Sequence, residues 1–208
     1  MYSLKEIYYT IQGEGVHTGR PAVFCRFSGC NLWSGLEKDR ETAICKFCDT
    51  DFWGTDGENG GKYSAEDLAS KIVELWPQGS EAPFVVCTGG EPLLQMDKAL
   101  IEELHQRGIF IAIETNGTLL PPPGIDWICV SPKVDSEVVL IEGDELKLVH
   151  PQVGGNIEKY ETMSFDHFSL QPLDDANQDA NIQTCIEIVK NKPKWQLSLQ
   201  THKMMGIP

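Results

Sequence analysis

Residues 82–117, APFVVCTGGEPLLQMDKALIEELHQRGIFIAIETNG, contain the pattern that decides the fold. The apolar run over 82–92 ends in two glycines, and a second apolar run covers 109–117. Between the two runs, a helix is expected from about Met96 to Arg107, ended by Gly108. Buried strands that alternate with a helix indicate a parallel sheet with crossover helices.

On both sides of this unit the same alternation continues. Further strands are expected at 21–28, 126–133, 144–149, 167–172 and 195–201, and further helices at 64–76 and 184–191. About six to seven strands, with few helices between 117 and 165, suit a partial barrel better than a complete one of eight units. The predicted fold class is therefore α/β: a partial (incomplete) TIM-type barrel of mostly parallel strands, in one domain over 1–208.

The composition limits the classes of ligand and the compartment. The chain has 17 Lys and Arg against 31 Asp and Glu, a net charge of −14. Such an acidic surface argues against nucleic acid and against a membrane, and it favours a small-molecule ligand. The chain shows no signal peptide and no apolar run near the roughly 20 residues of a membrane-spanning helix. We therefore expect a cytoplasmic protein.

The seven cysteines fall into two groups that differ in their neighbours. Four lie in apolar stretches, where free cysteine behaves as a small buried hydrophobe: Cys25, Cys87, Cys129 and Cys185. The other three lie among polar, charged or glycine residues in CNLWSGLEKDRETAICKFC (30–48): Cys30, Cys45 and Cys48. The odd total, without a secretory signal, argues against a disulfide framework.

Three interpretations of Cys30, Cys45 and Cys48 are open. Structural zinc takes four ligands, so His17 or Asp49 would have to complete the set. Three thiolates can instead hold a four-iron cluster in which one iron is left open to another ligand. The third interpretation is that these cysteines are inert.

Polar residues follow the ends of several predicted strands. Ligands of α/β barrels and open sheets gather at the carboxyl ends of the strands. The residues expected there are Cys30, Thr88 to Glu91, Glu114 to Asn116, Ser131 to Lys133 and Gln171. The sequence therefore predicts one binding site at this edge of the sheet.

Two of these motifs resemble the radical S-adenosylmethionine (SAM) superfamily: CKFC (45–48), with an aromatic residue before its second cysteine, and the strand ending TGGEP (88–92). The spacing C-x14-C-x2-C departs from the usual C-x3-C-x2-C, which leaves Cys25 as a competitor of Cys30 for the first ligand. Further motifs resemble the 7-carboxy-7-deazaguanine synthase family from residue 7 to the C-terminus: IQGEG (11–15), FCRFSGCNL (24–32), CDT (48–50), ETNG (114–117), SPK (131–133), QP (171–172) and LQTHK (199–203).

The resemblance implies a radical SAM core and a carbon–nitrogen lyase of queuosine and other 7-deazapurine biosynthesis. Its reaction would convert 6-carboxy-5,6,7,8-tetrahydropterin to 7-carboxy-7-deazaguanine with loss of ammonia. The implied cofactors are a [4Fe–4S] cluster, SAM and Mg²⁺; the cluster cleaves SAM, and the radical so formed takes hydrogen from C6 of the pterin. A homodimer is usual in the family, and flavodoxin or ferredoxin is the expected reductant.

The residue roles that the resemblance implies form three groups. Metal ligands would be Cys30, Cys45 and Cys48 for the cluster, and Thr50 for magnesium. SAM would contact Phe47, Cys48, Asp49, Gly89, Gly90, Glu91, Ser131, Pro132, Lys133 and Gln171. The pterin would contact Ile11, Gln12, Gly13, Arg26, Thr88, His202 and Pro208. Glycines at 89 and 90 would let the bare backbone approach a charged ligand.

Glu14 is added on chemical grounds, because the pterin's N3–H and 2-amino group form a donor pair that one carboxylate can accept side by side. Arg26 suits the substrate's carboxylate through its planar guanidinium, and its alternative is a surface ion pair. The alternative for His202 is a structural role, and for Pro208 a frayed terminus.

Two other functions stay open from the sequence. A glycyl-radical activating enzyme shares the cluster and the Gly-Gly-Glu strand, but it acts on a protein and should not need IQGEG (11–15). A zinc-stabilised binding protein without catalysis would be colourless when purified without oxygen.

Overall fold

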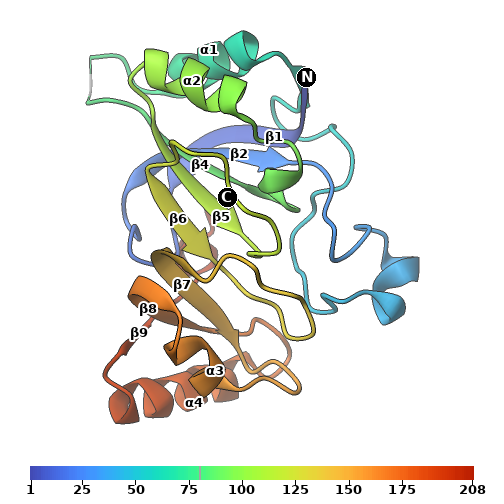
Figure 1. Ribbon diagram of the computed structural model, residues 1–208, viewed down its shortest axis with the longest axis vertical. Coiled ribbons are helices and arrows are strands. Elements are labelled where there is room, and N and C mark those ends of the chain that lie inside the picture. The colour runs from blue at the N-terminus through green and yellow to red at the C-terminus, as the bar shows by residue number, and fades with distance from the viewer. Residues whose placement is uncertain (80) are drawn as a thin grey trace.

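The computed structural model describes residues 1–79 and 81–208, and the nine strands of these residues form one sheet (Figure 1). The strands are β1 (Tyr2–Ile11), β2 (Pro21–Phe27), β3 (Gly61–Tyr63), β4 (Phe84–Gly89), β5 (Phe110–Thr115), β6 (Trp127–Val130), β7 (Glu142–His150), β8 (Ser164–Pro172) and β9 (Trp195–Leu197). The helices are η1 (Glu37–Thr42), α1 (Ala65–Leu75), η2 (Pro92–Leu94), α2 (Lys98–Gln106), α3 (Ile157–Glu161), α4 (Gln178–Asn191) and α5 (Thr201–Met205).

The strand order is β3-β1-β2-β4-β5-β6-β7-β8-β9, so β3 and β9 are the two edges of an open sheet. Every neighbouring pair from β2 to β9 is parallel. Only β1 departs from this, because it pairs antiparallel with both β2 and β3. The predicted partial barrel of mostly parallel strands is confirmed, with nine strands in place of six to seven.

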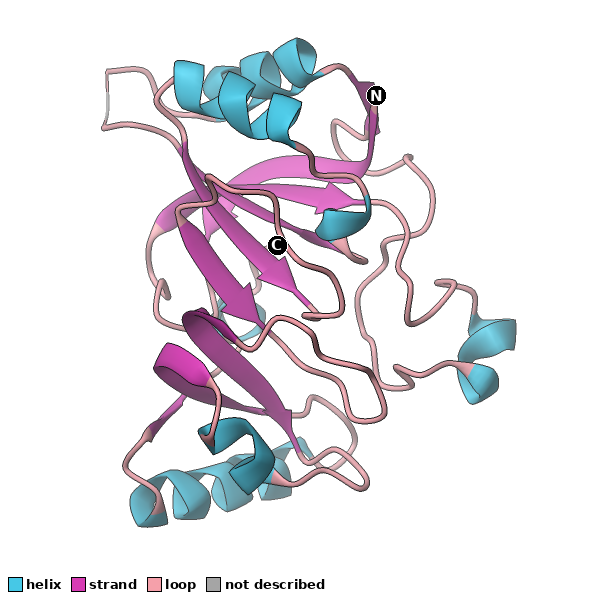
Figure 2. Cartoon of the chain, viewed as in Figure 1, coloured by secondary structure: helices cyan, strands magenta, loops and turns pink. Residues whose placement is uncertain are grey.

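Helices cover the outer side of the sheet in two groups, with α1 and α2 near β1 to β5 and α3 and α4 near β7 to β9 (Figures 1 and 2). Both α1 and α2 begin at side-chain caps: Ser64 accepts from the N–H of Asp67, and Asp97 accepts from that of Leu100. The crossovers between β5, β6 and β7 are loops, as the few helical signals between 117 and 165 predicted.

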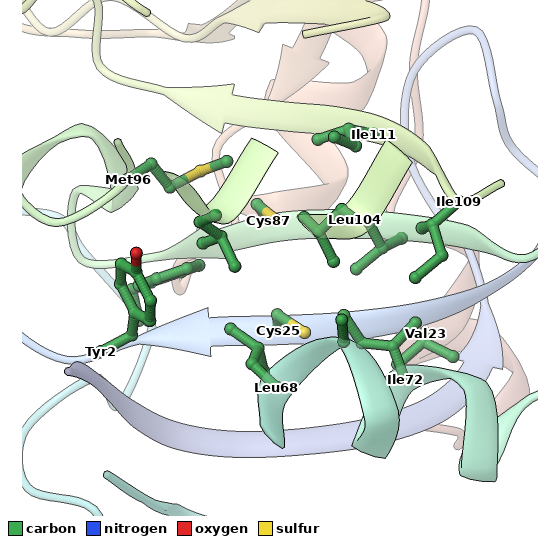
Figure 3. Packing of buried hydrophobic residues seen from close by; sticks show 14 of the residues in the cluster. Tyr2, Val23, Cys25, Leu68, Ile72, Cys87, Met96, Leu104, Ile109 and Ile111 are labelled. Carbon is green, nitrogen blue, oxygen red and sulfur yellow. The ribbon is translucent and has the colours of Figure 1, made fainter. Parts of the chain in front are cut away.

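The larger core lies between α1, α2 and the sheet (Figure 3). Leu68 and Ile72 of α1 and Leu104 of α2 are almost fully buried there, against Cys25 and Cys87 on neighbouring strands. Each buried aliphatic side chain contributes about 1.5–3 kcal/mol relative to exposure. All four cysteines expected in apolar surroundings are buried: Cys25, Cys87, Cys129 and Cys185.

Several elements differ from the sequence prediction, among them β3 and α3, which it did not include. The sequence did not predict β1, whose alternation is interrupted by a register shift between Leu4 and Glu6 and by Lys5, which is only 8% exposed. The expected strand over 195–201 is wrong beyond residue 197, because the chain leaves the sheet edge after β9 and forms α5 from Thr201. Among the described residues, no helix is long and apolar enough to cross a membrane.

Candidate active site

A cavity of about 400 Å³ lies at the carboxyl ends of the parallel strands. Its lining includes residues at or just after the ends of five strands: Cys30 after β2, Gly89 and Gly90 at β4, Thr115 and Asn116 at β5, Ser131 and Lys133 after β6, and Leu173 after β8. The predicted convergence of these strand ends on one site is therefore confirmed.

The long spacing between Cys30 and Cys45 does not separate the two thiols. The backbone N–H groups of Ile44 and Cys45 both donate to the carbonyl oxygen of Leu32, at 3.1 and 3.3 Å. The chain therefore leaves at Leu32 and returns to the same point, and the insert forms a side loop that carries η1. All three cysteines line the cavity: Cys30, Cys45 and Cys48.

Arg40, inside this insert, braces the cysteine pair. One guanidinium nitrogen donates to the carbonyl oxygens of Lys46 and Cys48, each at 3.0 Å, and the group lies 4.1 Å from the centre of the Trp33 ring. Its Nε also bonds Glu37 at 2.8 Å. Sequence analysis did not reveal this role, because the insert has the composition of a polar surface loop.

The thiols differ in acidity because their neighbours differ. A hydrogen bond from Cys45 lowers the pKa of Cys48 to about 6, although burial opposes the shift, and the same bond raises the pKa of Cys45. Burial raises the pKa of Cys30, partly offset by the backbone N–H groups of Leu32 and Trp33. Thiolate is the form that binds iron, and the positive charge of Lys133 favours it at Cys45 and Cys48.

These cysteines suit a cluster better than a single ion. In the described part of the chain, no group of three or more His, Cys, Asp or Glu side chains could hold one metal ion. His17, one candidate for the fourth zinc ligand, does not line the cavity, and its ring packs against Phe84 and Trp127. Three thiols around one cavity, one of them acidic, fit a cluster with an open iron.

Gly89 and Gly90 are required by the backbone next to them. Gly89 has φ +129°, and a Cβ there would lie 2.3 Å from the carbonyl oxygen of Phe27. A Cβ on Gly90 would lie 2.0 Å from the carbonyl oxygen of Gly29. The glycines therefore let β4 end tightly against the segment that leads to Cys30, a reason that the sequence did not provide.

Glu91 and Pro132, expected to contact SAM, do not line the cavity. Glu91 is 0% exposed and accepts hydrogen bonds from Leu93 N, Thr115 Oγ1 and Asn116 N, at 3.0, 2.8 and 2.8 Å. The turn into η2 directs this carboxylate inward, where it joins the ends of β4 and β5. These contacts are those of a structural residue, and the contact of Glu91 with SAM stays a prediction.

At the other end of the cavity, a lysine lies between two carboxylates. Lys147, in β7 and 3% exposed, is 2.5 Å from Glu14 Oε2 and 3.2 Å from Glu114 Oε2. Burial alone would raise the pKa of Glu14, but the charge of Lys147 and bonds from Lys147 and Gln200 lower it to about 2. Sequence reasoning missed Lys147, because nothing local distinguishes it from other charged residues in a strand.

The segment with Gly13 and Glu14 contacts the start of α5. Thr201 donates to the carbonyl oxygen of Gly13 from both N and Oγ1, at 2.9 and 3.0 Å. A Cβ on Gly13 would lie 2.3 Å from Nδ1 of His202, so only glycine allows this approach. Burial lowers the pKa of His202, which favours a neutral imidazole beside the cavity.

Arg26 lines the cavity and already has protein partners. Its Nε lies 2.8 Å from Glu6 Oε1, and one terminal nitrogen donates to the Tyr8 hydroxyl at 2.9 Å. The side chain is 18% exposed, so the ion pair is part-buried and differs from the surface pair considered from the sequence. These two bonds orient the guanidinium.

The remaining predicted site residues lie around the same cavity: Ile11, Gln12, Phe47, Asp49, Thr50, Thr88, Ser131, Lys133, Gln171 and Pro208. Some of them bond one another or neighbouring elements. Lys133 Nζ bonds Ser131 Oγ at 2.8 Å, and Gln171 accepts from Ser198 at 3.1 Å. The carbonyl oxygen of Pro208 accepts from Thr10 at 3.1 Å.

Known proteins are similar to the chain along its whole length. A 7-carboxy-7-deazaguanine synthase of Caulobacter vibrioides is 57% identical over 208 residues, 100% of this chain and 99% of that protein. One of Burkholderia multivorans is 55% identical with the same coverage. The chain belongs to the 7-carboxy-7-deazaguanine synthase family.

Two further comparisons agree with this family. The sequence profile of the Radical SAM superfamily matches residues 41–130, which begin inside the insert and include Cys45 and Cys48. The crystal structure of QueE from Escherichia coli is similar with a TM-score of 0.73 and 30% identity, covering 95% of this chain and 93% of that one. The chain is therefore a radical SAM lyase of the 7-carboxy-7-deazaguanine synthase family, and the superfamily implies a [4Fe–4S] cluster and SAM. The activating-enzyme and zinc-protein alternatives are not favoured.

Proposed function

We propose that the chain converts 6-carboxy-5,6,7,8-tetrahydropterin to 7-carboxy-7-deazaguanine with release of ammonia, in the biosynthesis of queuosine and other deazapurines. One observation carries the proposal: a single cavity is lined both by the three cysteines and by Arg26, Glu14 and Lys147. Cofactor and pterin can therefore lie within reach of each other.

Cys30, Cys45 and Cys48 would hold the cluster, and Arg40 would fix the backbone of the cysteine pair. SAM would lie against Phe47, Asp49, Gly90, Ser131, Lys133 and Gln171, which all line the cavity. When bound, these groups supply a radical that abstracts hydrogen from the substrate; the protein supplies binding, orientation and exclusion of side reactions.

The pterin would occupy the other end. Arg26 would pair with the substrate's carboxylate, because Glu6 and Tyr8 hold its planar guanidinium in one orientation. Ile11, Gln12, Gly13, Thr88, His202 and Pro208 would complete the pocket.

Magnesium would bind at Thr50, which lines the cavity. One hydroxyl is a weak ligand for this ion, so most of its shell would come from substrate oxygens and water. Binding of the ion and of the pterin would then depend on each other.

Family membership also suggests the domain organisation, the oligomeric state and the reductant of the enzyme. We expect one domain over 1–208, a homodimer, and flavodoxin or ferredoxin as reductant. A reducing cytoplasm suits a chain whose seven cysteines are all free.

The test is turnover by the anaerobically reconstituted enzyme with SAM, reductant and carboxytetrahydropterin, with and without magnesium. Mass spectrometry should detect 7-carboxy-7-deazaguanine, and ammonia should appear in equal amount. Cys48→Ala is the matched control and should form neither. SAM cleavage without any pterin turnover would contradict the proposed substrate and leave the superfamily assignment intact.

A further inference from the structure

The carboxylate of Glu14 has a hydrogen-bond donor beside each of its two oxygens. Lys147 Nζ lies 2.5 Å from Oε2, and Gln200 Nε2 lies 2.8 Å from Oε1. All three side chains line the cavity. From one end to the other, the polar atoms therefore form a row: donor, acceptor, acceptor, donor.

The row is held in place by its surroundings. Glu14 is 15% exposed and Lys147 only 3%. On its far side Lys147 contacts Glu114, whose other oxygen accepts from Gln12 Nε2 at 3.0 Å. Gln12 in turn accepts from the backbone N–H of Glu14 at 3.1 Å. The five residues therefore form one connected hydrogen-bond network: Gln12, Glu14, Glu114, Lys147 and Gln200.

Each member of the row keeps hydrogen-bonding capacity. An ammonium has three N–H groups, and within the described chain Lys147 forms ion pairs with two carboxylates. The amide nitrogen of Gln200 has two N–H groups, of which Glu14 accepts one. Each carboxylate oxygen has a second lone pair. A flat ligand can therefore meet all four atoms at once.

We infer that Lys147, Glu14 and Gln200 read the whole 2-amino-4-oxopyrimidine edge of the pterin. That edge presents the C4 carbonyl, N3–H, the 2-amino group and N1, which is acceptor, donor, donor, acceptor. The order is complementary to Lys147 Nζ, Glu14 Oε2, Glu14 Oε1 and Gln200 Nε2. The inference rests on the proposed function and adds two residues, Lys147 and Gln200, to its specificity.

The burial of the row makes mismatches costly. A ligand that lacks one complementary group leaves a buried polar atom without a partner, which costs more than the bond itself contributes. Loss of a hydrogen bond to a charged group corresponds to roughly a tenfold to hundredfold loss of affinity. Lys147 should therefore set the preference at C4, and Glu14 the preference at C2.

The test measures dissociation constants of three pteridine-6-carboxylates for the reconstituted holoenzyme with SAM. The first is 6-carboxypterin; the second has a 4-thioxo group in place of the 4-oxo group; the third lacks the 2-amino group. The native enzyme should bind 6-carboxypterin roughly tenfold more tightly than either other compound. Equal binding of all three would overturn the inference.

Substitutions assign each preference to one side chain. In Lys147→Met, the preference for 4-oxo over 4-thioxo should fall to within about twofold, while the preference for the 2-amino group persists. Gln200→Leu is the matched control in the same row, and it should weaken all three ligands while leaving the preference at C4 unchanged. A folded Lys147→Met enzyme that retains the C4 preference would overturn the inference.

Lys147→Met leaves two buried carboxylates without their cation, so the variant can fail to fold. The double variant Lys147→Met/Glu114→Gln keeps the net charge of the group at −1 and should show the same loss of preference at C4. Thermal unfolding and cluster absorbance establish that each variant is folded and loaded. Turnover of carboxytetrahydropterin is measured separately, so failure of the proposed function is distinguishable from failure of this inference.

Discussion

The ammonium nitrogen of Lys203, in α5, lies 2.6 Å from Oδ2 of Asp49, the residue after the third cavity cysteine. The same nitrogen lies 2.6 Å from Oδ2 of Asp174, just beyond β8. Lys203 therefore connects α5, which contacts Gly13, both to the segment after Cys48 and to the end of β8. Gly13, Asp49 and Lys203 all line the cavity, so this contact connects separate parts of its wall.

Replacing Lys203 by Met should loosen α5 over the cavity. Because these side chains are about a third to a half exposed, the pairs contribute only about 1 kcal/mol or less each. We expect KM for the pterin to rise about threefold to tenfold and SAM cleavage without pterin to increase. Lys98→Met, in an exposed pair with Glu102 on α2, is the control. Unchanged KM and unchanged uncoupled cleavage would contradict the connection.

Alanine substitutions should separate the two candidates for the first cluster ligand. Cys30→Ala should lose the cluster's visible absorbance and iron content, because Cys30 lines the cavity. Cys25→Ala should keep both and lose on the order of 1 kcal/mol of stability, because Cys25 is 0% exposed in the core. Iron analysis after anaerobic reconstitution checks both, and loss of iron from Cys25→Ala alone would reverse the assignment.

Arg26→Lys should reduce affinity for the substrate's carboxylate without affecting the cofactor. A lysine cannot keep the bonds to Glu6 and Tyr8 and also present a planar pair of donors. We expect KM for carboxytetrahydropterin to rise about tenfold to hundredfold, with SAM cleavage unchanged. A pterin without the 6-carboxylate should bind both enzymes equally, and an equal loss for both ligands would refute the role.

The acidity of Glu14 predicts a pH-dependent contribution to stability. Its pKa falls from 4.5 to about 2, because Lys147 and Gln200 outweigh the opposing effect of burial. The folded state therefore binds this proton less readily than the unfolded state, so the stabilisation is present above pH 4.5 and disappears as the pH falls toward 2.

Urea unfolding tests this with Glu14→Gln. The free energy of unfolding of the variant should be lower than that of the native protein by an amount on the order of 3 kcal/mol at pH 7, and this difference should shrink steadily below pH 4.5. Glu74→Gln, in an exposed pair with Lys71, should show little deficit at either pH. A deficit that does not change with pH would rule out the electrostatic origin.

Local patterns were sufficient for the parallel strands. Val85 and Ile111 lie in strands buried on both faces, and such strands read as continuous apolar runs. β1 could not be predicted in this way, because the register shift after Leu4 breaks the alternation and Lys5 enters a buried position. Its burial depends on partners from elsewhere in the chain, Asp51 and Asp56.

The site residues also differ in whether a local pattern could predict them. The spacing of Cys45 and Cys48 is local, so the cysteine end of the cavity could be predicted. Lys147 meets Glu14 across 133 positions of sequence, and no local pattern contains that pairing. Glu91 is a different case: its motif is associated with the cofactor, but the turn after β4 directs its carboxylate into the protein.

Closure of the pterin end depends on hydrogen bonds from Thr201 to the carbonyl oxygen of Gly13, 188 positions apart. Bringing such distant segments together in a disordered chain costs roughly 5 kcal/mol in entropy. The contact therefore depends on the sheet, which places the segment after β1 beside α5, and we expect it to form late in folding. Cys45 and Cys48, by contrast, are only three positions apart, so bringing them together costs much less entropy. Destabilisation of the fold should therefore weaken pterin binding before it separates the cysteine pair.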